Sequence, residues 1–239
     1  MRGAMAIATR ELSSYFRQPA GWIIIALYLL LAGLVFGLRI LTPGEPASLR
    51  AFFTYSGILL LPVVPAISMR LIAEELRSGT IESLLTCPIN GPGLVLGKFM
   101  GAGAFLLAML APTALYVLIL YRVAAPAPDI GPVLSGYLCL ILTGLLYLAI
   151  GTLASSLTSN ATLAFMITLF AILGLLLLDG AADHVPDRIR PVIMALAITP
   201  RITDFARGLV DTGHLVYFVS AAAWFLVWAI AAVELRKWR

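Results

Sequence analysis

The residues best placed for chemistry in this sequence form a glycine-containing stretch, Gly91–Phe99, which includes the pair Gly97-Lys98. A Gly-Lys pair of this kind is typical of nucleotide phosphate sites, which also need an earlier glycine and a following Ser or Thr. Here Pro92 occupies the position of the first glycine, Phe99 replaces the Ser or Thr, and an apolar run follows without a strand. We therefore predict that the chain does not bind ATP through this stretch.

Other residue sets that could support catalysis or ion coupling are also missing. No Asp, Glu, Lys, Arg or His lies near the middle of any long apolar run, although ion-coupled carriers commonly place such groups there. Intramembrane enzymes need paired acids, a Ser/His set or metal ligands. His184 and His214 are far apart in one predicted loop, which favours surface histidines over a metal pair. Cys87 and Cys139 fall in a loop and in an apolar run, so no disulfide is expected.

These absences lead to three expectations about function. We expect no catalytic residue, no metal site and no cofactor in this chain. We expect that, if the protein moves a substrate, the energy comes from another subunit. We also expect no nucleic-acid partner, because the basic residues behind the pI near 9.3 never form a run.

Six long apolar runs, each predicted to form a membrane-spanning helix, make up most of the chain. Each can cross about 30 Å of hydrocarbon, and only as a helix, because lipid offers the backbone no hydrogen-bond partners. The mean hydropathy of +1.01 and the charged fraction of 12% agree, since soluble proteins carry about 25% charged residues. We predict an all-α integral membrane protein with one domain over residues 1–239. Its six spans are Ala20–Leu38, Phe52–Met69, Leu94–Tyr121, Val133–Leu157, Ala161–Leu178 and Leu215–Val233.

Lysine and arginine residues predict the orientation of these spans. Nine of them lie on the side of the two termini and seven on the other side, four of the seven in the long loop 179–214. Lys and Arg in short loops mark the cytoplasmic side of a membrane protein. We therefore predict that both termini are cytoplasmic and that the protein lies in the inner (cytoplasmic) cell membrane.

The segment 70–93 is the most organised polar stretch of the chain. Leu71–Gly79 is predicted to extend the second span as a helix that ends at Gly79. Thr80 then suits the N-cap of a short amphipathic helix, roughly parallel to the membrane on the cytoplasmic side. Ile81, Leu84 and Leu85 would form the apolar face of this helix, and Pro88 would end it. Two interpretations are equally favoured: an interfacial helix held by acid–Arg pairs such as Glu74 with Arg77, or a docking element.

Prolines, glycines and one short turn within the spans bear on packing. Pro62 and Pro65 are predicted to break the second span and Pro112 to kink the third, since each removes a backbone donor. Ordinary tolerance of proline in membrane helices is favoured over a hinge or a pathway-lining kink. The motif Gly97-x-x-x-Gly101 provides a small face, which favours packing within the bundle over a specific dimer seam. The turn Thr158–Asn160 is short enough to predict a tight antiparallel hairpin of the fourth and fifth spans.

The order of residues in the polar segment matches a known pattern. Met69–Ile89 follows R-x-x-x-x-E-x-x-x-G-T-x-E-x-L-L-x-x-P-[IL], and Gly97-Lys98 comes shortly after it. This arrangement resembles the membrane subunit of ABC-2-type transporters, in which such a cytoplasmic segment precedes a Gly-Lys pair entering span three. Arg10-Glu11-Leu12, with Tyr15-Phe16 and Pro19, is similar to the amphipathic N-terminal helix of that family, called the elbow helix.

The region before the last span extends the resemblance over almost the whole chain. Phe205–Asp211, followed by Val216-Tyr217-Phe218, resembles the run before span six in the gliding-motility-type branch of the family. That branch often has His-Phe where Arg201-Ile202 stands here, so the branch is a looser match than the family.

The resemblance implies a division of the chain into functional segments. Residues 1–19 would form the elbow, 70–93 a coupling loop whose helix seats in a groove of an ATPase, and 179–214 external half-helices that re-enter the membrane before the last span. Apolar residues of the external segment fit such a helix: Ile189, Val192, Ile193, Leu196 and Ile198.

The resemblance also implies the site residues. Those of the coupling loop are Arg70, Glu74, Glu75, Gly79, Thr80, Glu82, Leu84, Leu85 and Pro88. Those of the elbow are Arg10, Glu11 and Phe16, and those of the external segment are Phe205, Arg207, Gly208 and Asp211. Acid–base contacts involving Glu11, Glu74, Glu75 and Arg70 would join the elbow and coupling helices.

The implied assembly contains the lipid-embedded permease, a second copy or a sister permease, and two separate ATP-binding subunits. ATP would be bound by those partners. The main alternative is a membrane scaffold or force-transmitting component that carries no flux. An ion-coupled carrier and a membrane enzyme are disfavoured by the missing residue sets above. Nothing in the sequence selects a substrate.

Overall fold

The six apolar runs form long helices in the computed structural model, which describes residues 2–40, 48–80, 91–124, 128–181, 186 and 190–236. Each predicted run lies inside one of six helical segments long and apolar enough to cross a membrane, so the six-span all-α fold is confirmed. The helices are α1 (Arg2–Arg17), α2 (Pro19–Arg39), α3 (Arg50–Ser68), α4 (Ala73–Ser78), α6 (Gly91–Leu110), the 3₁₀ turn η1 (Ala111–Thr113), α7 (Ala114–Val123), α8 (Ile130–Leu157), α9 (Ala161–Ala181), α10 (Arg190–Leu196), α11 (Thr199–Ala206) and α12 (Thr212–Arg236).

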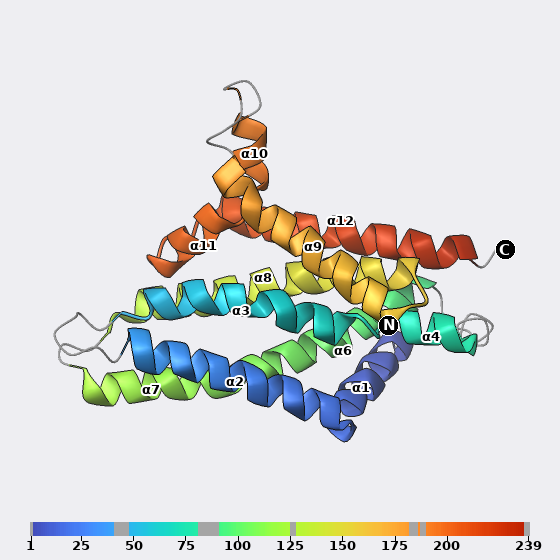
Figure 1. The fold of residues 1–239 in the computed structure, drawn as a ribbon, viewed down its shortest axis with the longest axis horizontal. Coiled ribbons are helices and arrows are strands. Elements are labelled where there is room, and N and C mark those ends of the chain that lie inside the picture. The colour runs from blue at the N-terminus through green and yellow to red at the C-terminus, as the bar shows by residue number, and fades with distance from the viewer. Residues whose placement is uncertain are drawn as a thin grey trace.

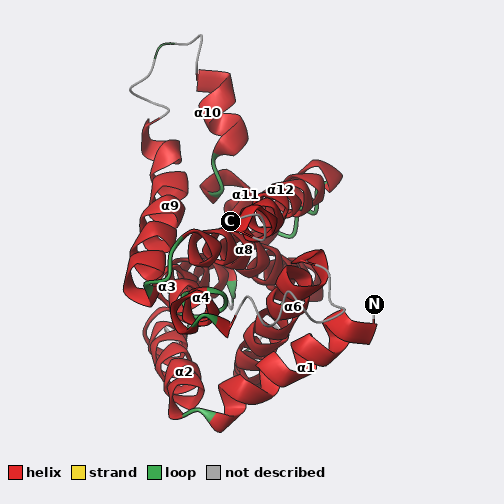
Figure 2. Ribbon diagram, turned by 90° about the vertical axis from the view of Figure 1, so that its right-hand side faces the viewer, coloured by secondary structure: helices red, strands yellow, loops and turns green. Residues whose placement is uncertain are grey.

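The long helices run side by side, so that the bundle has two distinct ends (Figure 1). One end carries α1, α4 and the C-terminal end of α12, and we call it the α1 end. The opposite end carries α11 and the start of α12, and we call it the α11 end. Helix α10 projects from the bundle beside the last turns of α9 (Figures 1 and 2).

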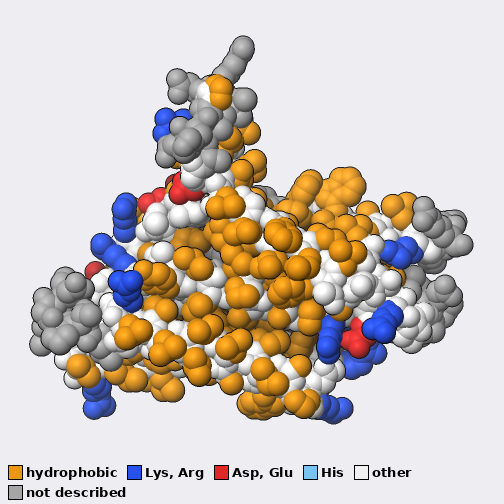
Figure 3. Space-filling model, in the orientation of Figure 1, with side chains coloured by type: hydrophobic (Ala, Val, Ile, Leu, Met, Phe, Trp, Pro, Cys, Tyr) orange, Lys and Arg blue, Asp and Glu red, His pale blue; other side chains and the backbone are white. Residues whose placement is uncertain are grey.

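Helices α3 and α8 form the centre of the bundle. In the most apolar part of α8, 67% of the residues are buried, whereas the corresponding share is only 17% in α9 and in α12. Helices α9 and α12 therefore lie at the periphery. On the face seen in Figure 3 apolar side chains cover the middle of the bundle, and charged side chains gather toward its ends and on the α10 projection. This distribution suits a bundle whose sides face lipid and whose ends face water.

The prolines act differently from the prediction. Helix α3 continues through Pro62 and Pro65, so the predicted break there is wrong; neighbouring helices allow proline within membrane helices. The third span does bend at Pro112, which lies in η1 between α6 and α7. Thr113 donates its hydroxyl to the Leu110 carbonyl oxygen at 2.6 Å, which provides a partner at this bend.

A tight hairpin joins α8 and α9, as predicted. The side-chain oxygen of Asn160 accepts hydrogen bonds from the Thr162 and Leu163 N–H groups at 2.9 and 3.4 Å, which caps the start of α9. Arg236 of α12 donates to the Ser156 and Leu157 carbonyl oxygens at the end of α8. A cation at a helix C-terminus is favourable because the last carbonyls lack partners within the helix.

Candidate functional site

Helix α1 packs against α6 through a glycine face. Its Ile7 and Ala8 side chains are buried, while the opposite side of the helix is polar. A Cβ atom added to Gly97 or Gly101 of α6 would lie 2.7 Å from a carbonyl oxygen of α1, closer than side chains tolerate. Glycine at these two positions therefore lets α1 lie directly on α6, and the Gly97-x-x-x-Gly101 motif packs within the bundle, as expected.

Aromatic residues fix α1 at its junction with α2. The Tyr15 hydroxyl donates to the Ile67 carbonyl oxygen at 2.7 Å, and its ring stacks on Phe105 at 4.6 Å. Burial raises the pKa of Tyr15 well above its ordinary value, so this hydroxyl remains a neutral donor. Phe16 lies edge-on to Phe105 and to Trp22, and its carbonyl oxygen accepts from the Trp22 indole at 2.9 Å. Phe16, predicted as an elbow residue, thus anchors the turn into α2.

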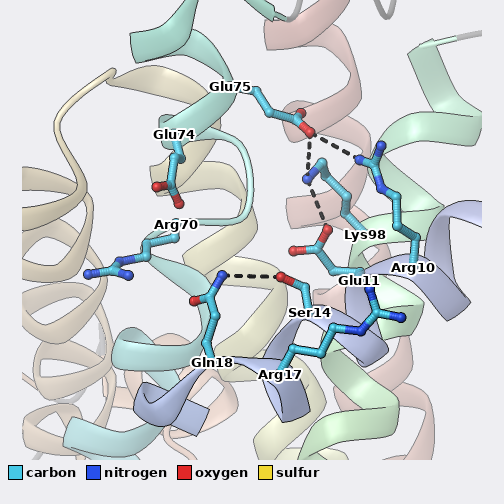
Figure 4. Close-up of a pocket in the computed structure, with 9 residues that line it drawn as sticks. All are labelled: Arg10, Glu11, Ser14, Arg17, Gln18, Arg70, Glu74, Glu75 and Lys98. Carbon is cyan, nitrogen blue, oxygen red and sulfur yellow. Dashed lines mark hydrogen bonds and ion pairs between the residues drawn. The ribbon is translucent and has the colours of Figure 1, made fainter.

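Four charged residues from α1, α4 and α6 meet at the α1 end (Figure 4). The Lys98 ammonium lies 3.2 Å from Glu11 and 2.9 Å from Glu75, and the Arg10 guanidinium lies 3.5 Å from the same Glu75 oxygen. We call Arg10, Glu11, Glu75 and Lys98 the Lys98 cluster. The Lys98 side chain is only 4% exposed, and those of Glu11 and Glu75 are 16% and 14% exposed. The charges of Lys98, Glu11 and Glu75 are largely removed from water and therefore depend on their partners, whereas Arg10 is exposed.

The Lys98 cluster lines a polar cavity of about 400 Å³. The cavity is also lined by Ser14, Arg17, Gln18, Arg70 and Glu74. Figure 4 shows the Arg70 guanidinium pointing away from Lys98, while Glu11 and Glu75 point toward it. Arg70 and Glu74 line the cavity but form no ion pair among the described residues. The predicted ion pair between Glu74 and Arg77 is also not formed among the described residues.

Helix α4 is a separate helix and not the predicted continuation of the second span. The chain leaves α3 after Ser68, turns through residues 69–72, and re-enters a helix at Ala73. The reason lies in α8, whose Ser155 hydroxyl accepts hydrogen bonds from Ile72 and Ala73. Gly79 ends α4 with a φ of +70°, as predicted, because a left-handed C-terminal residue favours glycine. Residues 81–90 lie outside the described residues, so the short amphipathic helix stays a prediction.

The α11 end is held together mainly by backbone acceptors and aromatic rings. Phe205 is fully buried, and its carbonyl oxygen accepts from the Ser135 hydroxyl of α8 at 2.7 Å. Gly208 has a φ of +90° and lies against Pro132. Asp211 caps α12 by accepting from the Gly213 N–H at 2.9 Å. Among the described residues no group of His, Cys, Asp and Glu side chains is arranged to hold a metal ion.

The charged side chains of the α11 end are more exposed than Lys98, Glu11 and Glu75. Asp204 lies 3.3 Å from His214 and 4.0 Å from Arg207, whose side chain is 62% exposed. Arg201 donates to the Ala195 and Ala197 carbonyl oxygens, and its guanidinium lies 3.8 Å from the centre of the Tyr217 ring. Arg201 thereby satisfies carbonyls at the end of α10, and it pairs with no carboxylate in the part of the chain that the structure describes.

A comparison with known families identifies the chain. The family model described as "ABC-2 family transporter protein" matches residues 5–197. The chain belongs to the ABC-2 transporter family. It is accordingly an ABC transporter permease and a multi-pass membrane protein. No curated protein matches the sequence. The gliding-motility branch suggested by Phe205–Asp211 is not confirmed and stays a prediction.

In this ABC-2 permease the structure joins some of the predicted site residues. Arg10 and Glu11 of α1, predicted as elbow residues, meet Glu75 of α4, predicted as a coupling residue, around Lys98. Phe205, Gly208 and Asp211 hold α11 and the start of α12, while Arg207 lies on the surface. Glu82, Leu84, Leu85 and Pro88 lie outside the described residues, and Thr80 lies at the edge of that gap with its hydroxyl 2.8 Å from that of Ser78.

Sequence reasoning missed the role of two cations in this permease. Lys98 was counted only as a flanking charge and as part of the Gly-Lys pair, but it is the buried centre of the cluster. Its signal was a lone lysine within an apolar helix, one residue after a glycine that contacts α1. Arg201 was noted only as a departure from the branch pattern. Its partners are backbone carbonyls, which every residue has, so the sequence does not indicate which of them Arg201 binds.

Proposed function

We propose that this chain is the membrane-spanning permease subunit of an ATP-driven ABC-2 exporter. It acts as a pair, either with a second copy of itself or with a sister permease, and the two together form the translocation pathway. Two separate ABC ATPase subunits bind and hydrolyse the ATP, so the permease needs no cofactor or catalytic residue of its own.

The observation that carries this proposal is the Lys98 cluster. It joins α4, from which the segment 81–90 continues, to α1 and α6. An ATPase that grips the segment 81–90 and moves on ATP binding would pull on α4. Because Glu75 of α4 is paired with Lys98, any displacement of α4 must either break a buried ion pair or move α6 and α1 with it. Breaking a buried pair leaves an uncompensated charge, which costs about 3–5 kcal/mol.

The proposal places the α1 end in the cytoplasm. The Lys and Arg distribution supports this orientation, since short-loop cations gather at this end. A reporter fused after Arg239 should therefore be active only as a cytoplasmic protein. An external reporter signal would contradict both the orientation and the ATPase docking.

The decisive experiment combines purification and ATP hydrolysis. The permease should co-purify with its ABC ATPase, and incorporation of the complex into membranes should stimulate ATP hydrolysis. Absence of both binding and stimulation would favour a scaffold that carries no flux. This experiment does not depend on knowing the substrate.

A charge reversal tests the coupling segment directly. Glu82→Lys should weaken ATPase association by more than tenfold, or uncouple hydrolysis from transport, because a reversed charge at a buried contact costs about 2 kcal/mol or more. Protein abundance should be unchanged, since the spans stabilise the bundle.

The matched control for this reversal is Glu45→Lys, in the loop between the first two spans at the predicted external side. It should leave ATPase binding intact. Full binding and full stimulation in Glu82→Lys would mean that this charge is merely solvated. Loss of the Glu82→Lys protein from the membrane would point to a purely structural segment.

A further inference from the structure

The turn between α3 and α4 is buried, so its backbone N–H groups cannot bond to water and need hydrogen-bond partners within the protein. Leu71, Ile72 and Ala73 are each at most 1% exposed. The first N–H groups of any helix lack partners within the helix, and burying them unpaired is costly. In many helices a Ser, Thr, Asp or Asn at the N-cap supplies the acceptor. Here the N-cap residue is Ile72, whose side chain can accept no hydrogen bond.

Ser155 of α8 supplies the acceptor that Ile72 cannot. Its hydroxyl oxygen accepts from the Ile72 and Ala73 N–H groups, both at 2.9 Å, and the hydroxyl lies 3.3 Å from the Met69 carbonyl oxygen, to which it donates. A serine hydroxyl has one hydrogen to donate and two lone pairs to accept with. All three are therefore used within this single turn. Ser155 caps α4 from 83 residues away in the sequence.

The approach of the turn to α8 depends on a second residue, one helical turn before Ser155. Gly151 lies against Ser68, the last residue of α3, so closely that a Cβ atom at Gly151 would clash with the Ser68 side chain. Gly151 and Ser155 share one face of α8 because they are four residues apart. This face receives the end of α3 and the start of α4 together.

The direction of α4 is consequently set by α8 rather than by its own sequence. We propose that Ser155 is a positioning residue for ATPase coupling: it fixes the angle at which α4 leaves α3, and thereby presents the following coupling segment to the ATPase. The proposal rests on the coupling role proposed above. It differs from the role of the Lys98 cluster, which holds the side of α4, because Ser155 holds the start of the helix.

The first test is a structural measurement that requires no ATPase. Hydrogen exchange of the permease in lipid nanodiscs should show the Ile72 and Ala73 amides exchanging about tenfold faster in Ser155→Ala than in the wild type. Ser156→Ala is the matched control. Ser156 is also fully buried, but within the described residues its hydroxyl donates to the Leu153 carbonyl oxygen of its own helix and makes no bond to α4. It should leave the exchange of Ile72 and Ala73 unchanged.

The second test measures coupling in the complex with the ATPase. Ser155→Ala should retain ATPase binding and wild-type abundance but reduce the membrane stimulation of ATP hydrolysis several-fold, while Ser156→Ala should match the wild type. If Ser155→Ala does not accumulate, Ser155→Cys keeps the approximate volume with a weaker acceptor and is compared in the same way.

The outcomes separate this inference from the proposed function. Unchanged exchange in Ser155→Ala would overturn the capping role, and faster exchange with full stimulation would overturn the positioning role. A wild-type permease that neither binds nor stimulates the ATPase would instead overturn the coupling function itself. In that case the hydrogen-exchange result would still decide whether Ser155 caps α4.

Discussion

The two ends of α8 each bind a short helix through a serine, but they do so in different surroundings. Ser155 caps α4 at the α1 end, and Ser135 donates to the Phe205 carbonyl of α11 at the other end. Beside α4 lie the mostly buried charges of Lys98, Glu11 and Glu75, whereas Asp204 of α11 and its partner Arg207 are more exposed. Buried charges make the α1 end sensitive to small displacements, because attraction and desolvation are both large there.

The α11 end, by contrast, relies on contacts that do not depend on charge pairing. Its helix is held by a neutral hydrogen bond, by the packing of Phe205 against Phe218, and by Arg201 lying on backbone carbonyls and the Tyr217 ring. This difference is what the proposed coupling role of the α1 end requires, because in the part of the chain that the structure describes that end alone pairs mostly buried charges. Four substitutions test this contrast, ordered here from the largest expected effect to the smallest.

Lys98→Met should have the largest effect. It leaves Glu11 and Glu75 mostly buried without their central cation, which should lower the free energy of unfolding by about 3 kcal/mol. Thermal unfolding in detergent measures the change, and stimulation of ATP hydrolysis should fall in parallel. Lys98→Arg, which keeps the charge, should lose less. An unchanged melting temperature in Lys98→Met would show that the buried ion pairs do not stabilise the α1 end.

Gly101→Ala should have the next largest effect. The new methyl group would lie 2.7 Å from the Ala8 carbonyl oxygen and from the Glu11 Cβ atom, so α1 must move away from α6. Such overpacking costs about 1–3 kcal/mol, and the shift should also weaken ATPase stimulation.

Gly174→Ala in α9 is the control for this substitution, because apart from the backbone of α9 itself no described atom lies within 4 Å of its added Cβ. It should be neutral or slightly stabilising, since alanine favours helices over glycine. Equal unfolding curves for the two variants would contradict the close packing of α1 on α6.

Ser135→Ala should destabilise the α11 end moderately and leave coupling intact. It removes the hydrogen bond to the Phe205 carbonyl, which also accepts from the Gly208 N–H, so the expected loss is about 1 kcal/mol. Chemical unfolding measures this loss, with Ser220→Ala, whose hydroxyl bonds only within α12, as the control. A drop in ATPase stimulation as large as that expected for Ser155→Ala would abolish the contrast between the two ends.

Arg10→Ala should have the smallest effect. The Arg10 side chain is 59% exposed and lies 3.5 Å from Glu75, so water and salt screen the pair and its loss should cost below about 0.5 kcal/mol. Unfolding measured at low and high salt tests this, because the small difference from the wild type should vanish at high salt. A loss as large as that of Lys98→Met would mean that Arg10, rather than Lys98, is the main partner of Glu75.

Much of the fold was predictable because membrane spans are a local property of the sequence. Each span is a continuous apolar run of sufficient length, and lipid permits only a helix there. The hairpin turn at Thr158–Asn160 and the end of α4 at Gly79 were also predictable, since short polar turns and left-handed glycines act within a few residues. The break between α3 and α4 was not, because Leu71–Gly79 has helical periodicity and its interruption depends on Ser155.

The sequence by itself determined the six-helix membrane class and the family through the order of its motifs. The resemblance also named Glu11 and Glu75 as joining residues, but it named Glu74 and Arg70 with them, which form no ion pair among the described residues. Only the tertiary structure decided which cation pairs with those acids, where α4 leaves α3, and how α11 is held. The physical reason is distance along the chain. Glu11 and Lys98 are 87 residues apart, and Ser155 lies 83 residues from Ile72. Such partners meet only when packed helices bring them together, so no local pattern of residues records the contact.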